Sequence, residues 1–186
     1  CCKALVNSSS KMDTVLGEIL NLRSYDPFFK AIIITESKEA GPYIQKKLTH
    51  KLKVGVMQRP KGSSAVRAQR ELVKFQNGEY DVLVCSFEAV RVGINLDQAG
   101  AIYFVDTTIY DTEYKQALAR ISRCGTGHCK LTATFVFVKE TLSEEIYNYH
   151  EDRRKGMTIK AAAKRFEDDN PHDFSDPKDF RSEEHT

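Results

Sequence analysis

The sequence predicts an α/β fold, in which helices cover both faces of a mainly parallel sheet in a three-layer α/β/α arrangement. Short aliphatic and β-branched runs alternate along the chain with segments that have the apolar spacing of helices. Most runs are apolar at successive positions, which is typical of parallel strands buried on both faces. Hydrophobic residues make up 41% of the 186 residues, which is enough for a sizeable core and excludes wholesale disorder.

The first half of the chain begins with a helical pattern over residues 11–23, which follows three serines that can cap a helix and ends at an Asp-Pro pair. The β-branched run at 31–35 then predicts a buried strand. Residues 39–50 have helical spacing again, and 53–57 resemble a second strand.

The second half continues the alternation. A Gly-Ser-Ser sequence opens a predicted helix over 63–76, and the apolar run 81–85 follows it as a third strand. Strands are expected at 101–105 and 132–138, on either side of a helix over 112–121. In such a sheet, ligands bind at loops that leave the carboxyl ends of the strands.

Four parts are expected along the chain. An N-terminal linker covers 1–9, the α/β domain 10–140, and trailing helices that pack on this domain 141–166. The trailing helical pattern is divided near Lys155-Gly156-Met157. Residues 167–186 are polar, acidic and almost without aliphatic side chains, so we expect a mobile, disordered tail.

Charge and cysteine content limit the classes of function. The 28 Lys and Arg nearly balance the 26 Asp and Glu, so nucleic-acid binding requires positive charge concentrated on one face. No apolar run is long enough for a membrane helix, and no secretory signal opens the chain. The odd number of cysteines, five, then fits a reduced intracellular protein. Cys124, His128 and Cys129 lack a second ligand pair with the usual zinc spacing, so no metal site is predicted.

One candidate phosphate site is the segment Arg59-Pro60-Lys61-Gly62-Ser63-Ser64, directly after the second strand. Backbone N–H groups at a helix start, with cations beside them, suit a phosphate oxygen. The alternative is an ordinary helix cap with solvated charges.

A second candidate follows the third strand, where Gly93 stands two residues before Asn95 between aliphatic residues. A tight turn here would point the Asn95 side chain outward. The alternative is a plain turn that returns to the core.

A third candidate is the helical segment that carries Gln116, Arg120 and Arg123. If one helix continues through it, the three side chains share a face. Two neighbouring guanidinium groups favour a polyphosphate, because the planar fork matches phosphate oxygens. The alternative is a solvated face paired with nearby acidic residues.

The chain has no G-x-x-x-x-G-K-[ST] loop, no G-x-S-x-G and no H-E-x-x-H. A complete ATPase or hydrolase is therefore hard to build from these residues alone.

The three segments, in order and spacing, resemble the second RecA-like lobe of superfamily 2 helicases, in the Snf-type chromatin-remodelling and DNA-translocase branch. That family has S-L-x-A-G-G-V-G-L-N-L where this chain has residues 86–96. It then has Q-A-x-x-R-x-x-R-x-G ten residues after a strand that ends in Asp, as Gln116 follows Asp106 here. The likeness covers residues 8–166 and implies a RecA-like fold.

This chain departs from the family at several positions, although both arginines are present. The two adjacent glycines are Val90 and Arg91, and the His before the second arginine is Ser122. The Gln after the motif's glycine is Thr126, and W-N-P is replaced by Ile109-Tyr110-Asp111.

The resemblance implies that ATP binds between this lobe and a first RecA-like lobe, which carries the phosphate loop and the Mg²⁺ ligands. Arg120 and Arg123 would be catalytic, and Gln116 would orient them or the attacking water. Gly93 and Asn95 would line the ATP site.

The resemblance also implies contacts with the phosphates of DNA, which is double-stranded in this branch, and a nuclear protein that acts on chromatin, with no membrane partner. The nucleic-acid-binding candidates are Arg59, Gly62, Ser63 and Ser86, helped by Lys61 and Arg67. Two alternatives stay open: a non-catalytic docking module derived from a helicase lobe, which the altered glycines favour, and an RNA helicase lobe.

Overall fold

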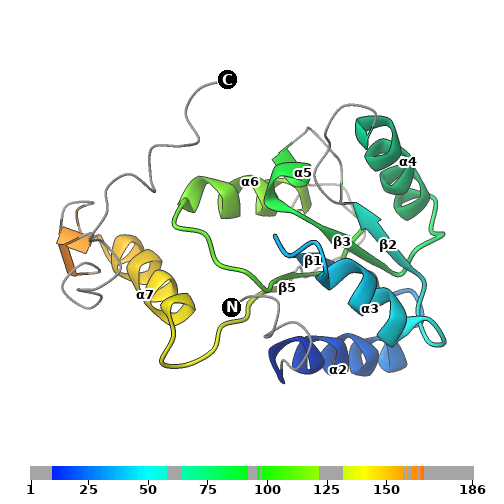
Figure 1. Ribbon diagram of the computed structural model, residues 1–186, viewed down its shortest axis with the longest axis horizontal. Coiled ribbons are helices and arrows are strands. Elements are labelled where there is room, and N and C mark those ends of the chain that lie inside the picture. The colour runs from blue at the N-terminus through cyan, green and yellow to red at the C-terminus, as the bar shows by residue number, and fades with distance from the viewer. Residues whose placement is uncertain are drawn as a thin grey trace. The chain divides into compact units, whose positions relative to one another are not determined.

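The computed structural model describes residues 10–57, 64–91, 96, 98–121, 132–156, 158, 161–162 and 164–165. The chain divides into two compact units, Cys1–Phe137 and Val138–Thr186 (Figure 1). None of the described helices has both the length and the apolar character needed to cross a membrane.

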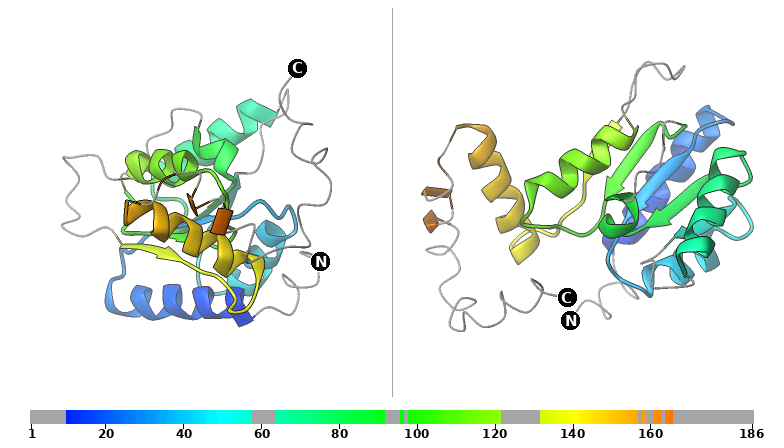
Figure 2. Two further views of the ribbon diagram at one scale, coloured as in Figure 1. Left: turned by 90° about the vertical axis from the view of Figure 1, so that its left-hand side faces the viewer. Right: turned by 90° about the horizontal axis from the view of Figure 1, so that it is seen from above.

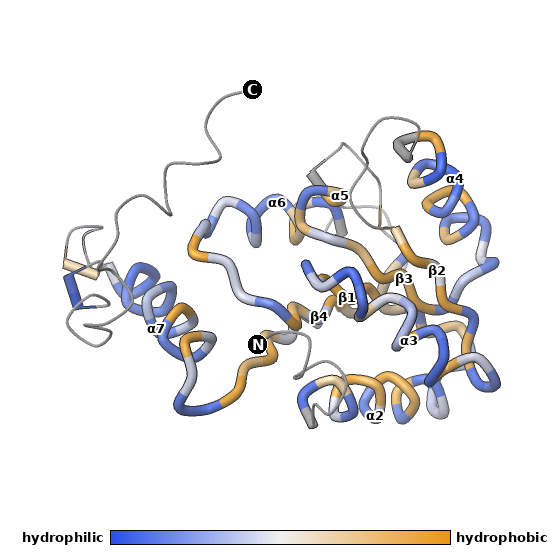
Figure 3. Tube along the Cα trace, viewed as in Figure 1, coloured by the Kyte–Doolittle hydropathy of each residue, from blue (hydrophilic) through white to orange (hydrophobic). Residues whose placement is uncertain are grey.

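The first unit is built on a five-stranded sheet with the order β2-β3-β1-β4-β5, and every neighbouring pair is parallel. The strands are β1 (Ala31–Ile34), β2 (Val54–Met57), β3 (Val82–Cys85), β4 (Ala101–Phe104) and β5 (Thr132–Phe135). The three inner strands are buried at every residue, as their continuous apolar sequences predict, whereas the edge strands are partly exposed. Figure 3 shows the hydrophobic residues of β2 and β3 in orange.

Helices cover both faces of the sheet (Figure 2). Side chains of α2 (Ser10–Tyr25) and α3 (Ala40–Leu48) share one buried cluster with alternate strand residues such as Ile33 and Tyr103. Side chains of α4 (Ser64–Gln76), α5 (Phe87–Arg91) and α6 (Asp111–Ile121) share the other. The predicted three-layer α/β/α fold with a parallel sheet is confirmed.

Helix α5 was not expected, because residues 86–96 were predicted to form a loop with a tight turn. The structure has a short helix at the start of this segment, so that prediction was wrong there. The physical reason lies in two features. The Ala89 N–H donates to Ser86 Oγ (3.3 Å), which caps the helix, and Phe87, Ala89 and Val90 bury their side chains against the sheet.

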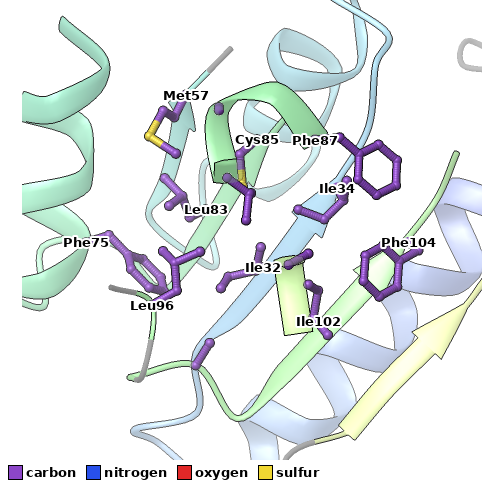
Figure 4. Close-up of a cluster of buried hydrophobic side chains, with 14 of the residues drawn as sticks. Ile32, Ile34, Met57, Phe75, Leu83, Cys85, Phe87, Leu96, Ile102 and Phe104 are labelled. Atoms are coloured by element: carbon purple, nitrogen blue, oxygen red, sulfur yellow. The ribbon is translucent and has the colours of Figure 1, made fainter. Parts of the chain in front are cut away.

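The cluster beneath α4, α5 and α6 is shown in Figure 4, where Ile32, Ile34, Leu83 and Cys85 of the sheet point towards the helices. Four aromatic side chains at one end of this cluster hold α6 on the sheet. The Phe104 ring stacks on Phe87 and Phe135, with centroids 5.9 and 4.9 Å away, and meets Tyr114 edge-on at 5.0 Å. Tyr114 OH also accepts a hydrogen bond from the Thr108 N–H (2.8 Å), which ties α6 to the loop that precedes it.

The Cys85 thiol lies inside this cluster, and its side chain is inaccessible to solvent. Burial raises the pKa of the Cys85 thiol, and the negative charge of Glu36 adds to this effect. Because the thiolate is the reactive form, we expect Cys85 to resist iodoacetamide at about pH 8 while the protein is folded. Peptide mass spectrometry should show alkylation of Cys85 only after urea is added. Rapid alkylation in native buffer would contradict the packing described here.

The second unit contains α7 (Leu142–Arg154). This helix ends at Lys155-Gly156, where Gly156 has a φ of 91°, a conformation that favours glycine and stops a helix. The end of α7 lies where the division of the trailing helical pattern was predicted. Arg165 returns to α7, because its guanidinium lies 2.9 Å from the Asp152 carboxylate. The predicted tail, 167–186, lies outside the described residues.

Candidate nucleotide and nucleic-acid site

The described residues include three of the nine predicted site residues: Ser86, Gln116 and Arg120. The other six lie outside the described residues: Arg59, Gly62, Ser63, Gly93, Asn95 and Arg123. The structure therefore shows the strands and helices that flank these segments.

Helix α6 carries two of the three predicted catalytic residues, Gln116 and Arg120. Tyr114 and Ala117 are buried against the core, whereas Gln116 is exposed and Arg120, one turn further on, is half-buried. The predicted common face of Gln116 and Arg120 agrees with this exposure pattern. Arg123 comes two residues after the last residue of the helix, Ile121.

The end of α6 is fixed to the segment that carries the predicted ATP-binding residues. The buried Leu96, which directly follows Asn95 in sequence, donates its backbone N–H to the Arg120 carbonyl (3.2 Å). The fold thus brings the chain next to Gly93 and Asn95 to the end of the arginine helix. Neither segment alone shows this contact in its sequence.

The predicted nucleic-acid contacts start from a common edge of the sheet. Ile34, Met57 and Cys85 are aligned across β1, β2 and β3, so the chain leaves all three strands at one edge. Ser86 is the first residue after β3, and the segment that carries Arg59, Gly62 and Ser63 follows Met57.

Ser86 is only 3% exposed, and its hydroxyl caps α5. Contact of Ser86 with a phosphate stays a prediction, and it would require the start of α5 to move. Arg67, which was expected to help, is exposed on α4, as is the neighbouring Arg70. These two arginines place positive charge on the helix that follows the segment of Arg59.

Sequence reasoning missed three polar residues at this edge. The Thr35 hydroxyl and the Glu36 backbone N–H both donate hydrogen bonds to Asp106 Oδ2. The distances from Thr35 Oγ1 and from Glu36 N to this oxygen are each 2.7 Å. The Glu36 carboxylate in turn accepts the Phe87 backbone N–H, with 2.8 Å between Phe87 N and Glu36 Oε1. Their signal in the sequence was their place directly after two buried strands, where functional residues of parallel sheets gather.

No group of three or more His, Cys, Asp or Glu side chains within the described ranges could hold a metal ion. Cys124, His128 and Cys129 lie outside those ranges.

Comparisons with known proteins agree with this framework. The family described as "Helicase conserved C-terminal domain" matches residues 10–125, more than half of the chain. The Helicase-like transcription factor of Mus musculus is 26% identical over 151 residues, which cover 79% of this chain. The protein of the same name from Homo sapiens is 25% identical over 152 residues, which cover 80% of it. The match spans 15% of the length of each of these relatives.

Solved structures show the same fold. The C-terminal part of the Fun30 ATPase domain aligns with a TM-score of 0.65 and 21% identity, over 77% of this chain and 46% of that one. Dbp5 of S. cerevisiae, bound to RNA and ADP BeF3, aligns with a TM-score of 0.61 and 19% identity, over 80% and 37%. The Hef helicase domain of Pyrococcus furiosus aligns with a TM-score of 0.56 and 19% identity, over 74% of this chain and 28% of that one.

The family model indicates the C-terminal lobe of a helicase, the solved structures share its fold, and the curated relatives favour the Snf branch. The chain therefore belongs to the helicase conserved C-terminal domain family, as a RecA-like lobe of a superfamily 2 helicase of the Snf type.

Proposed function

We propose that this chain is the C-terminal lobe of an ATP-dependent translocase that moves along double-stranded DNA. The observation that carries the proposal is the exposed face of α6, where Gln116 and Arg120 lie one turn apart on a helix held by buried aromatic side chains. The family match adds that such lobes belong to ATP-dependent enzymes. These 186 residues contain no phosphate loop, so we assign that loop to a first RecA-like lobe.

In the proposed site, Arg120 and Arg123 face the phosphates of ATP when this lobe closes on a first RecA-like lobe. ATP supplies the transferable phosphoryl group, and the Mg²⁺ ligands belong to that first lobe. Guanidinium groups fit this task because their planar forks bind phosphate oxygens in pairs. The donors present here are of the right kind: Arg120 is half-buried on a rigid helix, and Gln116 beside it can orient a guanidinium or a water molecule.

The order of the chain supports the same arrangement. The Leu96–Arg120 backbone hydrogen bond holds the segment of Gly93 and Asn95 to the end of α6. We therefore place Gly93 and Asn95 in the lining of the nucleotide cleft. Closing and opening of the two lobes through the ATP cycle would then move the protein along its strand.

DNA would contact the edge of the sheet where β1, β2 and β3 end. A translocase must tolerate any base sequence, so its contacts go to phosphates. Arg59, Gly62 and Ser63 are the proposed contacts, together with Arg67 on the exposed side of α4, and Ser86 where α5 can move. Action on chromatin in the nucleus is part of this proposal, and it rests on relatives that are named transcription factors.

The test is the ATPase activity of the complete protein with double-stranded DNA, single-stranded DNA and RNA of equal length. Stimulation by duplex DNA supports the proposal. Stimulation by RNA alone supports an RNA helicase lobe, and no ATPase activity with any of the three supports the non-catalytic docking module.

The 186-residue chain on its own is expected to hydrolyse no ATP above a mock preparation, because the phosphate loop is missing. Phosphate release by the purified chain, with and without DNA, checks this. The matched control is the complete protein at the same molar concentration. Turnover by the chain alone would contradict a site shared between two lobes.

A further inference from the structure

Two carboxylates at the edge of the sheet join loops that are far apart in sequence. Asp106, after β4, accepts hydrogen bonds from Thr35 and from the Glu36 backbone, both after β1. Glu36 then accepts the N–H of Phe87, the first residue of α5 after β3. The exits of three adjacent strands are thus tied together by side chains.

The connection continues from α5 to the arginine helix. The Phe87 ring meets the Tyr114 ring of α6 edge-on, with centroids 5.5 Å apart, and α5 packs along α6. Beyond α5, the Leu96 N–H is bonded to the Arg120 carbonyl. Contacts therefore connect Asp106 to Glu36, Glu36 to the start of α5, and α5 to α6. A separate hydrogen bond joins Leu96 to the end of α6.

We propose that Glu36 and Asp106 are positioning residues that couple DNA contact at the sheet edge to the placement of Arg120. This inference rests on the proposed function. A DNA strand that binds where β1, β2 and β3 end would meet the loop of Thr35 and Glu36. Any shift of that loop changes the hydrogen bond that holds the start of α5, and α5 passes the shift to α6.

The geometry is suited to such a link. Glu36 is exposed to solvent, so it lies at the surface where a strand can reach it, whereas its two partners are attached to buried elements. Hydrogen bonds with a charged acceptor are stronger than neutral ones, so each of these contacts can transmit a displacement.

The experiment uses the complete protein with Glu36→Ala, Glu36→Gln, Asp106→Ala and the double variant Glu36→Ala/Asp106→Ala. Asp13→Asn is the matched control, because it removes an exposed carboxylate that contacts Tyr43 and Lys47 on the opposite face of the sheet. Three quantities are measured: ATPase stimulation by duplex DNA, KM for ATP, and amide hydrogen exchange of peptides that cover 87–96 and 111–121.

We expect Glu36→Ala to lower DNA stimulation about tenfold with little change in KM for ATP, since a charge-assisted hydrogen bond is lost. Exchange should become faster in both peptides. Glu36→Gln should restore much of the stimulation, because its amide oxygen can still accept the Phe87 N–H. DNA stimulation in the double variant should be no lower than in the more impaired of the two single variants, because both residues act along one path.

Faster exchange confined to the start of α5, with normal exchange across 111–121, would overturn the coupling, and so would stimulation equal to that of Asp13→Asn. If the unmodified protein shows no response to any nucleic acid, the proposed function fails. The exchange result in 111–121 then decides on its own whether Glu36 and Asp106 position Arg120.

Discussion

Arg123→Ala in the complete protein is expected to abolish DNA-stimulated ATP hydrolysis, with turnover reduced by ~10³–10⁵, while ATP affinity stays within a few-fold. An arginine of this kind acts mainly on charge that develops in the transition state, so its loss falls on turnover. Binding depends chiefly on the phosphate loop of the first lobe. Steady-state ATPase rates and a separate nucleotide-binding titration measure the two effects.

Related substitutions separate charge from geometry. Arg123→Lys should fail as well, because a point charge does not reproduce the planar fork of a guanidinium. Arg120→Ala should also abolish turnover, and it should weaken ATP affinity more than Arg123→Ala does.

The control is Lys115→Ala, which removes a cation from the same helix. The Lys115 side chain is 74% exposed and forms a surface ion pair with Asp111, so little change is expected. Near-normal turnover of Arg123→Ala would mean that Gln116, Arg120 and Arg123 form a solvated face.

The sheet could be predicted because its inner strands have a strong local signal. Ala31–Ile34 and Val82–Cys85 are apolar at every position, and the structure buries every one of these residues. The helices on both faces followed from apolar spacing, as in α6, where Tyr114 and Ala117 are buried and Gln116 is exposed. Such patterns depend only on neighbouring residues, which is why one sequence was enough.

What could not be predicted depends on contacts between distant residues. Helix α5 has five residues, too few for a periodic pattern, and it is fixed by Ser86 and by the carboxylate of Glu36. The Glu36–Asp106 contact joins residues 70 positions apart, and neither residue is part of a motif that names a partner. The cap that the Ser86 hydroxyl provides for α5 is also absent from the sequence analysis, and the contact of Ser86 with a phosphate stays a prediction.

Phe104→Ala is expected to have the largest effect on stability. Phe104 is 1% exposed and contacts the rings of Phe87, Tyr114 and Phe135, so it joins the sheet to both α5 and α6. Truncation of a buried Phe to Ala lowers the free energy of unfolding by about 4 kcal/mol, because packing is lost and a cavity remains. The melting temperature, followed by circular dichroism, should fall by about 10 °C.

Tyr110→Ala is the matched control for this prediction, since it removes an aromatic side chain from the connection that follows β4, where Tyr110 is 59% exposed. Its removal should change the free energy of unfolding by no more than about 0.5 kcal/mol. Phe104→Leu should fall between the two, because it keeps an apolar side chain in the cluster but loses the ring contacts. If Phe104→Ala melts within about 2 °C of the unmodified protein, the four aromatic rings do not hold α6 in place. The rigid placement of Arg120, on which the proposed catalytic role depends, would then need another source.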